Sequence, residues 1–431
     1  MLGGCSVMPS WLGGKKEEKP KLPGERIAVL PVGAGLEPDA TLKTVPFTLP
    51  PPAMNADWPQ HNGTISAAAG NLAGGGFSIV MNATAGDGNA FESTLVPPPV
   101  VAGGTVFVMD AAGTISAHDA GDISKIHWQS PGVSEADDPP ILGGGLAFDG
   151  GKLYAVSGLG AAAAFDAATG QPIWRKKMDV SFLSAPQVTD GKLFVLTLDN
   201  QIYAINATNG DALWNQRGIN ETTGLMNQVS PTVTGDTVIV PYSSGEVYAL
   251  AAADGHELWS DSLSPGGGHI GTSALFGGIG GDPVVDGSVV FTVSTGNALS
   301  VLALATGQHA WDRPIGSLNT PWLAGDYMYL LTTDNTVACF VKYDGRIRWA
   351  TKLRDFKDEK DKKHPIVWRG PVVTDGRVAV VGSNGQLLLL AAEDGKITAT
   401  RDIPENIYTA PIVAGGRMYL IGQDATLYEL Q

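Results

Sequence analysis

The sequence predicts an all-β protein, an eight-bladed β-propeller of four-stranded antiparallel blades, closed by an N-terminal strand. Three observations predict this fold. A sequence unit recurs eight times, each unit reads as short strands separated by tight turns, and no helix pattern separates the strands. Glycine supplies 56 of the 431 residues, about twice its average usage, which favours frequent turns and few long helices.

The repeated unit begins with a proline, which is followed by a short apolar run and a Gly or Asp turn. Neighbouring prolines are between 38 and 52 residues apart, close to the spacing of propeller blades, about 40–45 residues. The eight prolines are Pro99, Pro140, Pro186, Pro231, Pro283, Pro321, Pro371 and Pro411.

The third unit illustrates the order of strands within each repeat. An alternating apolar run over 192–197 is followed by a polar turn at Asp199-Asn200 and by a second run over 201–205. A second tight turn then comes at Thr208-Asn209-Gly210, where Asn-Gly supplies the positive φ that two-residue hairpins need. With the proline segment and a last run that ends in tryptophan, the unit predicts four antiparallel strands.

A tryptophan recurs at one position of the last strand. Because one residue type recurs in six units, we interpret it as a structural wedge between blades, rather than as a stacking surface for a sugar, a base or a quinone ring. The seventh unit has Ala399 at this position. The six tryptophans are Trp128, Trp174, Trp214, Trp259, Trp311 and Trp349.

The eighth unit stops at Gln431, after its third strand. The segment 76–80 can supply the missing strand, with Val80 at the tryptophan position. A ring that is closed by strands from both ends of the chain leaves no free sheet edge at the junction.

The first residues indicate a membrane anchor. Leu2-Gly3-Gly4-Cys5 resembles a bacterial lipobox, whose cysteine receives lipid, and the polar, proline-rich sequence that follows is typical of a tether. Only four residues precede Cys5, so either an upstream signal is missing or the match is chance and Cys5 is a free thiol. We expect residues 1–55 to be this lipobox remnant and flexible tether, and residues 56–431 to be the propeller.

Composition excludes several classes of function. The chain carries 28 Lys+Arg and 43 Asp+Glu, a formal net charge of −15, which argues against binding of nucleic acid. No run of 18 or more apolar residues predicts a membrane-spanning helix. The two cysteines, Cys5 and Cys339, cannot form a disulfide framework or a Cys-rich metal site, and we expect Cys339 to fill a small buried position.

The repeats carry a family resemblance. The runs 163–170, 204–214 and 249–255 resemble the PQQ-type propeller repeat, and with the lipobox and tether the chain resembles the BamB family of the outer-membrane β-barrel assembly (BAM) complex. The resemblance implies a lipid-anchored scaffold on the periplasmic face of the bacterial outer membrane, with no catalytic residue, cofactor or metal. It further implies binding to the POTRA domains of BamA and to other BAM subunits, and contact with unfolded outer-membrane protein clients.

The resemblance also suggests partner-binding residues. In this family, loops between neighbouring blades contact BamA, one of them through a Leu-Arg pair, which here corresponds to Leu225 and Met226. A second contact uses two Asp ahead of a blade proline, where this chain has only Asp282. We expect the glycine-rich loop 264–281 to join Leu225 on one face, and the charged segment 352–365 to be a long solvated loop.

Two alternatives remain open, a PQQ-dependent quinoprotein dehydrogenase-like enzyme and a generic propeller adaptor. A quinoprotein holds its quinone with a calcium ion and an Asp base, often beneath a vicinal disulfide. The chain has no adjacent cysteine pair and no Cys-x-x-Cys-His sequence, and its seven histidines show no metal-ligand spacing. The Gly-His and Trp-Asp signature of WD repeats is also absent from the sequence.

Overall fold

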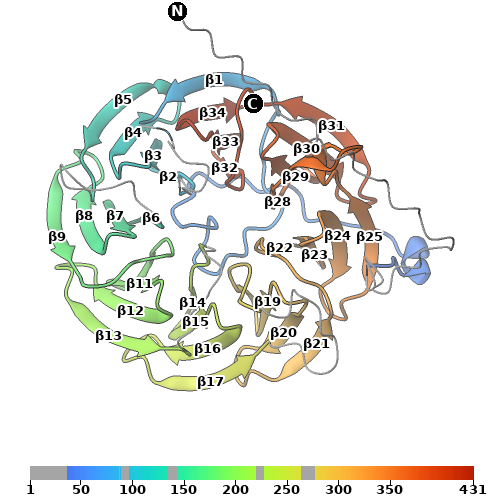
Figure 1. The fold of residues 1–431 in the computed structure, drawn as a ribbon, viewed down its shortest axis with the longest axis horizontal. Coiled ribbons are helices and arrows are strands. Elements are labelled where there is room, and N and C mark those ends of the chain that lie inside the picture. The colour runs from blue at the N-terminus through green and yellow to red at the C-terminus, as the bar shows by residue number, and fades with distance from the viewer. Residues whose placement is uncertain (1–35, 87, 89–96, 134–142, 220–227, 264–276) are drawn as a thin grey trace, which may run out of the picture. The chain divides into compact units, whose positions relative to one another are not determined.

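The computed structural model describes residues 36–86, 88, 97–133, 143–219, 228–263 and 277–431. Strands from these residues form eight four-stranded antiparallel sheets, arranged as the blades of a ring (Figure 1). The predicted all-β propeller is therefore confirmed. Within this described part, no helix is long and apolar enough to cross a membrane.

Blades 1 to 4 follow one another along the chain, each running from the centre of the ring to its rim. Blade 1 contains β2 (Val100–Ala102), β3 (Thr105–Met109), β4 (Ile115–Asp119) and β5 (Asp122–Ser130). Blade 2 contains β6 (Gly144–Asp149), β7 (Lys152–Ser157), β8 (Ala161–Asp166) and β9 (Pro172–Lys177). Blade 3 contains β10 (Gln187–Thr189), β11 (Lys192–Leu196), β12 (Gln201–Asn206) and β13 (Ala212–Arg217). Blade 4 contains β14 (Thr232–Thr234), β15 (Thr237–Pro241), β16 (Glu246–Ala251) and β17 (Glu257–Ser262).

Blades 5 to 8 complete the ring, and the last takes its rim strand from the N-terminal side. Blade 5 contains β18 (Val284–Asp286), β19 (Val289–Val293), β20 (Leu299–Ala303) and β21 (His309–Arg313). Blade 6 contains β22 (Trp322–Ala324), β23 (Tyr327–Leu331), β24 (Thr336–Val341) and β25 (Ile347–Lys352). Blade 7 contains β28 (Trp368–Thr374), β29 (Arg377–Gly382), β30 (Gln386–Ala391) and β31 (Ile397–Asp402). Blade 8 contains β32 (Ile412–Ala414), β33 (Arg417–Ile421), β34 (Thr426–Leu430) and β1 (Ile79–Thr84).

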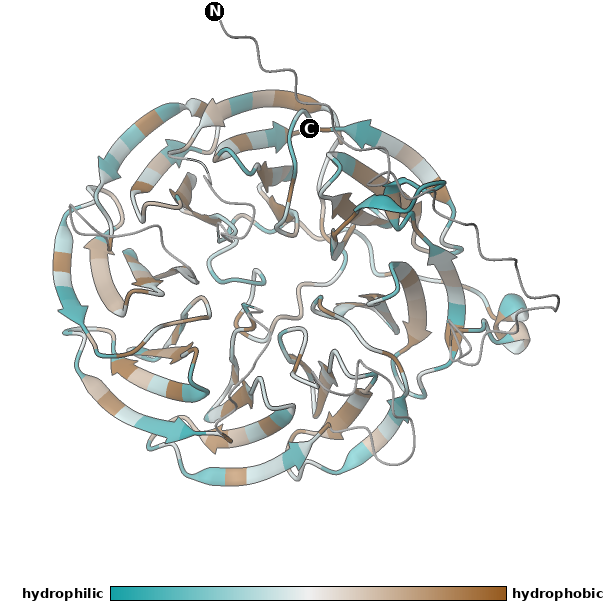
Figure 2. Ribbon diagram, in the orientation of Figure 1, coloured by the Kyte–Doolittle hydropathy of each residue, from teal (hydrophilic) through white to brown (hydrophobic). Residues whose placement is uncertain are grey.

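Burial follows the position of each strand in its blade. The second strand of blade 3, β11, is buried from its second residue onward, whereas four of the six residues of the rim strand β13 are exposed. Figure 2 shows the same trend around the ring, with hydrophobic residues concentrated on the inner strands and polar residues more frequent on the rim. Because sheets pack face to face only through apolar faces, the core lies between neighbouring blades.

The N-terminal strand closes the ring as predicted, although its register differs. β1 pairs with β34 to complete blade 8. In the other blades the residue before the tryptophan position is a β-bulge, as between Ala212 and Trp214. The bulge in β1 lies between Ile79 and Met81, so Val80 is the exposed bulge residue and Met81 holds the tryptophan position. The expectation for Val80 was therefore wrong by one residue, because counting from a glycine cannot locate a bulge.

Blade 2 begins later than its proline suggested. Pro140 lies outside the described residues, and the first strand of the blade is β6 (Gly144–Asp149), which turns at Gly150-Gly151. Counting back from this turn places Leu146, rather than a proline, at the start of the repeat.

Residues 36–55, expected to form part of a flexible tether, instead lie against blade 6 and the inner strands. Asp39 donates its backbone N–H to Ile347 O, 2.8 Å away, and caps the short 3₁₀ helix η2 (Ala40–Thr44). Farther along, the ring of Phe47 lies 4.7 Å from that of Tyr327. At least twenty residues of the expected tether therefore pack on the propeller. They do so because their apolar side chains are removed from water there.

The following segment, residues 55–72, passes around the inside of the ring and bonds to every blade in turn (Figure 1). We call this segment the inner strap. It contacts the blades in spatial order, starting with blade 8 and ending with blade 7. Its hydrogen-bonded pairs are Asn55 with Val413, Trp58 with Val101, Pro59 with Phe148, Gln60 with Val188, Ile65 with Val233, Ser66 with Val285, Gly70 with Trp322, and Leu72 with Val373.

The inner strap satisfies an otherwise open sheet edge. Seven of its eight blade partners occupy the same position of the innermost strand, two residues after the start of the repeat, as Val101 and Val373 do. Backbone groups at that edge have no strand on their inner side, and unpaired buried backbone groups are costly. The strap therefore pairs the inner edges, as β1 pairs the outer edge of blade 8.

The charged segment 352–365 contains a short hairpin. β26 (Phe356–Asp358) pairs with β27 (Lys363–Pro365), and Trp368 Nε1 donates to Arg354 O at 2.8 Å. The expected solvated loop is thus a two-stranded extension that is tied to blade 7.

Candidate functional site

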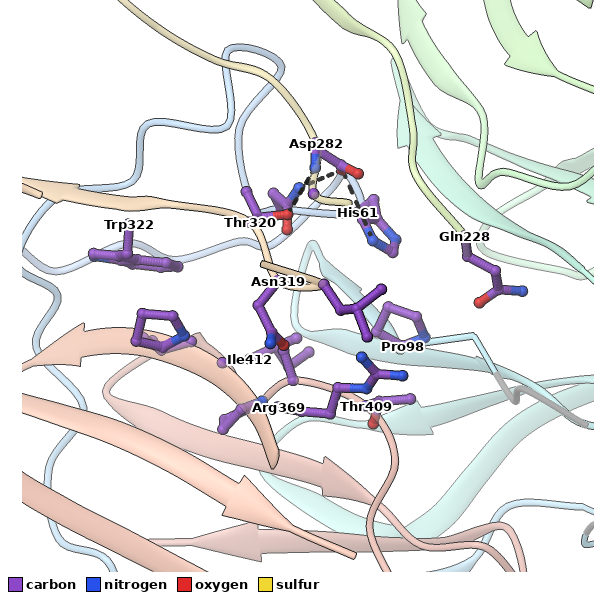
Figure 3. A pocket seen from close by; sticks show the side chains of 18 of the residues that line it. His61, Pro98, Gln228, Asp282, Asn319, Thr320, Trp322, Arg369, Thr409 and Ile412 are labelled. Atoms are coloured by element: carbon purple, nitrogen blue, oxygen red, sulfur yellow. Dashed lines mark hydrogen bonds and ion pairs between the residues drawn. The ribbon is translucent and has the colours of Figure 1, made fainter. Parts of the chain in front are cut away.

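A cavity of about 110 Å³ lies among the innermost segments of the ring. Its walls come from the inner strap, from the loops that lead into blades 4 to 6, and from blades 7 and 8. Figure 3 shows the polar side chains that face it, among them His61, Gln228, Asp282, Arg369 and Thr409. Residues far apart in the sequence therefore share one polar space.

Asp282 lies on one side of the cavity, where its carboxylate accepts hydrogen bonds. Its side chain is 2% exposed, and its Oδ1 atom accepts the Ser230 backbone N–H at 2.7 Å. Its Oδ2 atom accepts a hydrogen bond from Asn62 and lies 3.8 Å from His61 Nε2. Burial raises the pKa of the Asp282 carboxyl to about 6, although the nearby His61 and the two hydrogen bonds oppose this shift.

This geometry gives Asp282 bonds inside the chain, and its role in partner binding stays a prediction. The carboxylate of Asp282 is directed inward and bonded to the inner strap. The structure therefore gives Asp282 an internal role, joining the strap to the entry of blade 5. Glycine-rich neighbours suggested an exposed loop, but Gly280 and Gly281 pack closely against the backbone of 317–320.

Arg369 faces the cavity from β28. Its Nε atom donates to Tyr408 O at 3.0 Å, and the guanidinium points into the space that Gln228 and Thr409 also face (Figure 3). No carboxylate of the described residues lies within ion-pair distance of Arg369. Burial lowers the pKa of Arg369, since the charged form loses water that no counter-ion replaces.

Three further polar atoms around the cavity lack hydrogen-bond partners among the described residues. They are His61 Nδ1, Gln228 Nε2 and Thr409 Oγ1, and all three are buried. Buried polar groups in folded proteins are nearly always hydrogen-bonded, so three such atoms around one small space need an explanation. The sequence contained no signal for this cluster, because neither the charge nor the spacing of these residues is unusual.

The cavity does not fit a quinone cofactor held by calcium. A volume of about 110 Å³ is well below the roughly 300–1,000 Å³ typical of sites for larger organic ligands. Among the described residues, no group of three or more His, Cys, Asp or Glu could hold a metal ion. Cys339 is buried, which raises its pKa to about 12, so it remains a thiol at neutral pH.

The six repeated tryptophans lie between blades. Each indole Nε1 donates to a backbone carbonyl of the next blade at 2.7–3.3 Å. Each ring also covers the turn glycine of that blade, as Trp174 covers Gly210. The donor and acceptor pairs are Trp128 with Ala167, Trp174 with Ala207, Trp214 with Ala252, Trp259 with Leu304, Trp311 with Lys342, and Trp349 with Ala392.

Three of the residues singled out in the sequence cannot be placed. Cys5, Leu225 and Met226 lie outside the described residues, as does most of the loop 264–281. Their roles in lipidation and partner binding remain predictions. Of the proposed partner residues, Asp282 alone lies within the described part of the chain, and it is found at the central cavity.

Comparison with known proteins identifies the family. A family model described as "Outer membrane protein assembly factor BamB" matches residues 124–351 and 357–431, which is well over half of the chain. This chain belongs to the BamB family. An outer membrane protein assembly factor BamB from Yersinia pestis is 26% identical over 337 residues, covering 77% of this chain and 83% of the relative.

Solved structures show how widely this fold is shared among proteins of different function. The crystal structure of BamB from Moraxella catarrhalis superposes with a TM-score of 0.68 and 19% identity, covering 82% of this chain and 99% of that one. A quinohemoprotein alcohol dehydrogenase from Comamonas testosteroni reaches a TM-score of 0.66 at 15% identity, covering 88% and 80%. At such identities the likeness concerns the fold alone, so the enzyme does not bear on the chemistry of this BamB-family chain.

Proposed function

We propose that this protein is a lipid-anchored scaffold of the BAM complex on the periplasmic face of the outer membrane. It binds the POTRA domains of BamA and other BAM subunits, and assists the insertion of β-barrel proteins. The observation that carries the proposal is the match to the BamB family model over residues 124–351 and 357–431. The central cavity fits a calcium-bound quinone poorly, which weighs against a quinone site at that place.

Binding to BamA can be tested by calorimetry with the full chain and the periplasmic domains of its cognate BamA. We expect saturable binding with a Kd of about 1–10 μM, which corresponds to a free energy of about −7 to −8 kcal/mol. Leu225→Ala should weaken binding at least about tenfold, as expected for an apolar contact residue. Leu213→Ala removes an exposed leucine from the rim strand β13 and serves as the matched control.

Two outcomes would contradict this proposal at different levels. No binding at several hundred micromolar would remove the BamA scaffold role while leaving the family assignment intact. If Leu225→Ala and Leu213→Ala weaken binding to BamA equally, the complex forms but Leu225 is not part of its interface. A shortened fragment should start no later than Gly35, because later starts cut into the residues that pack on blade 6 and form the inner strap.

The membrane anchor requires a lipid on Cys5. Expressed in bacteria behind a lipoprotein signal, the protein should fractionate with outer membranes, and mass spectrometry should find the acyl mass on the peptide that contains Cys5. Cys5→Ser should release the protein into the periplasmic fraction. Cys339→Ala changes the buried second cysteine and should leave both measurements unchanged.

Contact with unfolded β-barrel clients could use the rim strands, since an extended chain can add to an exposed sheet edge. Gly218 N donates inward to Asn200 O, and strand residues alternate, so the amide of Asn215 faces away from β12. Asn215→Pro, combined with proline at the equivalent positions Arg175 and Ser260, should reduce client insertion without disrupting the BamA complex. The corresponding triple alanine variant is the control, and equal insertion by both variants would exclude this mode of contact.

A further inference from the structure

We propose that the central cavity is a binding site for the carboxylate of a small organic acid, with Arg369 as its main anchor and Gln228 and Thr409 as further hydrogen-bond donors. This site is separate from the proposed BAM scaffold role and does not depend on it. Its ligand would tie blades 7 and 8 to the entry of blade 4, across the centre of the ring.

Arg369 brings a positive charge to the cavity without a carboxylate partner among the described residues. Its guanidinium uses only Nε, for the carbonyl of Tyr408, whereas the partly buried Arg417 is paired with Glu429. The remaining guanidinium N–H groups face the cavity (Figure 3). A cation withdrawn from water favours an anion, and the planar guanidinium matches the two oxygens of a carboxylate.

Two buried polar side chains beside Arg369 have atoms without a hydrogen-bond partner among the described residues. Gln228 Nε2 is a donor, and the Thr409 hydroxyl can donate, and both are buried without a partner among the described residues. With Arg369 they surround the cavity with hydrogen-bond donors. Asp282 is the one carboxylate among the described residues that line it, and it is directed to Ser230 and Asn62.

The size and the walls of the cavity suit a small, partly apolar molecule. A cavity of about 110 Å³ holds roughly seven to ten waters by the probe-volume measure, and hence an acid of up to about ten non-hydrogen atoms. Its walls also include the apolar side chains of Trp58, Pro98, Leu318 and Ile412. A short acid with an apolar body, such as propionate or benzoate, therefore fits both the donors and the walls.

The test compares propionate with propionamide, which has the same shape and no charge. The full chain is titrated with sodium propionate, propionamide or sodium chloride at matched ionic strength, and binding is followed by saturation-transfer NMR and by the thermal midpoint. We expect saturable binding and a raised midpoint with propionate only. Equal responses to propionate and propionamide, or to propionate and chloride, would overturn the proposal.

The variants locate the site. Arg369→Gln should weaken propionate binding at least about tenfold, because the charge-assisted bonds are lost. Arg401→Gln makes the same change of charge on the exposed rim strand of the same blade, and should keep binding within about twofold of the parent. Equal affinities of these two variants would exclude a site at Arg369.

A second variant covers the case in which Arg369→Gln does not fold. Thr409→Val keeps the shape of the side chain and removes only the hydroxyl, so it should weaken propionate about three- to tenfold. Unchanged affinity in Thr409→Val would then count against the site. An acetyl- and amide-capped Ala-Glu-Ala peptide distinguishes the source of the carboxylate. If this peptide binds and propionate does not, the ligand is an acidic side chain of another protein, and the proposal of a small acid is overturned.

Discussion

Two concentric sets of contacts hold this propeller together, and they are built on different principles. The outer set consists of six tryptophans, each of which bonds to the next blade and covers its turn glycine. The inner set is one continuous segment, residues 55–72, which bonds at least once to each of the eight blades. The outer contacts repeat because the blades repeat, whereas each inner contact uses a different residue.

The comparison shows where a repeat protein depends on non-repeated sequence. The outer set stops at the junction where the chain ends meet, because blade 7 has Ala399 and blade 8 has Met81 at the tryptophan position. From blade 8, Tyr419 Oη and Arg417 donate to Ala120 O, the carbonyl equivalent to the acceptors of the tryptophans. The strap bonds to blade 8 through Asn55 and to blade 1 through Trp58, so it crosses from blade 8 to blade 1, where no tryptophan does.

The largest effect should come from removing the strap. A chain that starts at Gly76 loses the bonds to all eight inner strands and the buried side chain of Trp58. At about 1 kcal/mol per hydrogen bond and about 3–5 kcal/mol for the tryptophan, we expect a loss above 5 kcal/mol, or no cooperative unfolding. Denaturant unfolding followed by circular dichroism measures this loss. A chain that starts at Gly35 is the control. Equal stability of the two chains would show that the strap does not stabilise the ring.

Breaking one contact of the outer set should have a smaller effect. Trp349 is 5% exposed and bonds to Ala392 O, so Trp349→Ala should lower the free energy of unfolding by about 3–5 kcal/mol. Trp349→Phe keeps most of the apolar contact and loses the hydrogen bond, with an expected cost of about 1–2 kcal/mol. Chemical denaturation of both variants tests the ranking, and a loss below 1 kcal/mol for the alanine variant would contradict a wedge.

The burial of Asp282 should make stability depend on pH. The pKa of Asp282 is raised to about 6 from 3.8, so its ionised form is disfavoured in the folded state. Its contribution is complete below pH 4 and is lost as pH rises through 6, by about 2–3 kcal/mol. Asp282→Asn should therefore gain stability relative to the parent between pH 4 and pH 7. Parallel curves for the two proteins over this range would show that Asp282 does not titrate in it.

A matched pair of glycines isolates the tryptophan contact from backbone strain. In blade 3, Gly210 and Gly191 have φ values of +76° and +72°. A Cβ added at Gly210 would lie 2.6 Å from the Trp174 ring, whereas one added at Gly191 meets nothing within 4 Å. Gly191→Ala should cost about 1 kcal/mol through its positive φ, and Gly210→Ala about 2 kcal/mol more through overpacking. Equal thermal midpoints of the two variants would show that the close contact between position 210 and the Trp174 ring does not affect stability.

The blades were predictable because the information that specifies them is local. A four-residue spacing from the turn glycine to tryptophan, as between Gly210 and Trp214, lies within one hairpin, and the period-2 pattern of each strand shows which face is buried. Closure by the N-terminal strand could be inferred because the last unit lacks a strand. The one-residue error at Val80 arose because a β-bulge leaves no mark in the spacing.

The repeat, the strand order within each blade, the position of the tryptophans and the family could thus all be read from the residues alone. The course of the inner strap and the residues of the central cavity emerge only in the folded ring. The bond from Asn62 to Asp282 spans 220 residues, and the bond from Trp322 to Gly70 spans 252. Such pairs have no period and no fixed spacing, because they form only when eight separately specified blades close into a ring and bring their inner edges together around one segment.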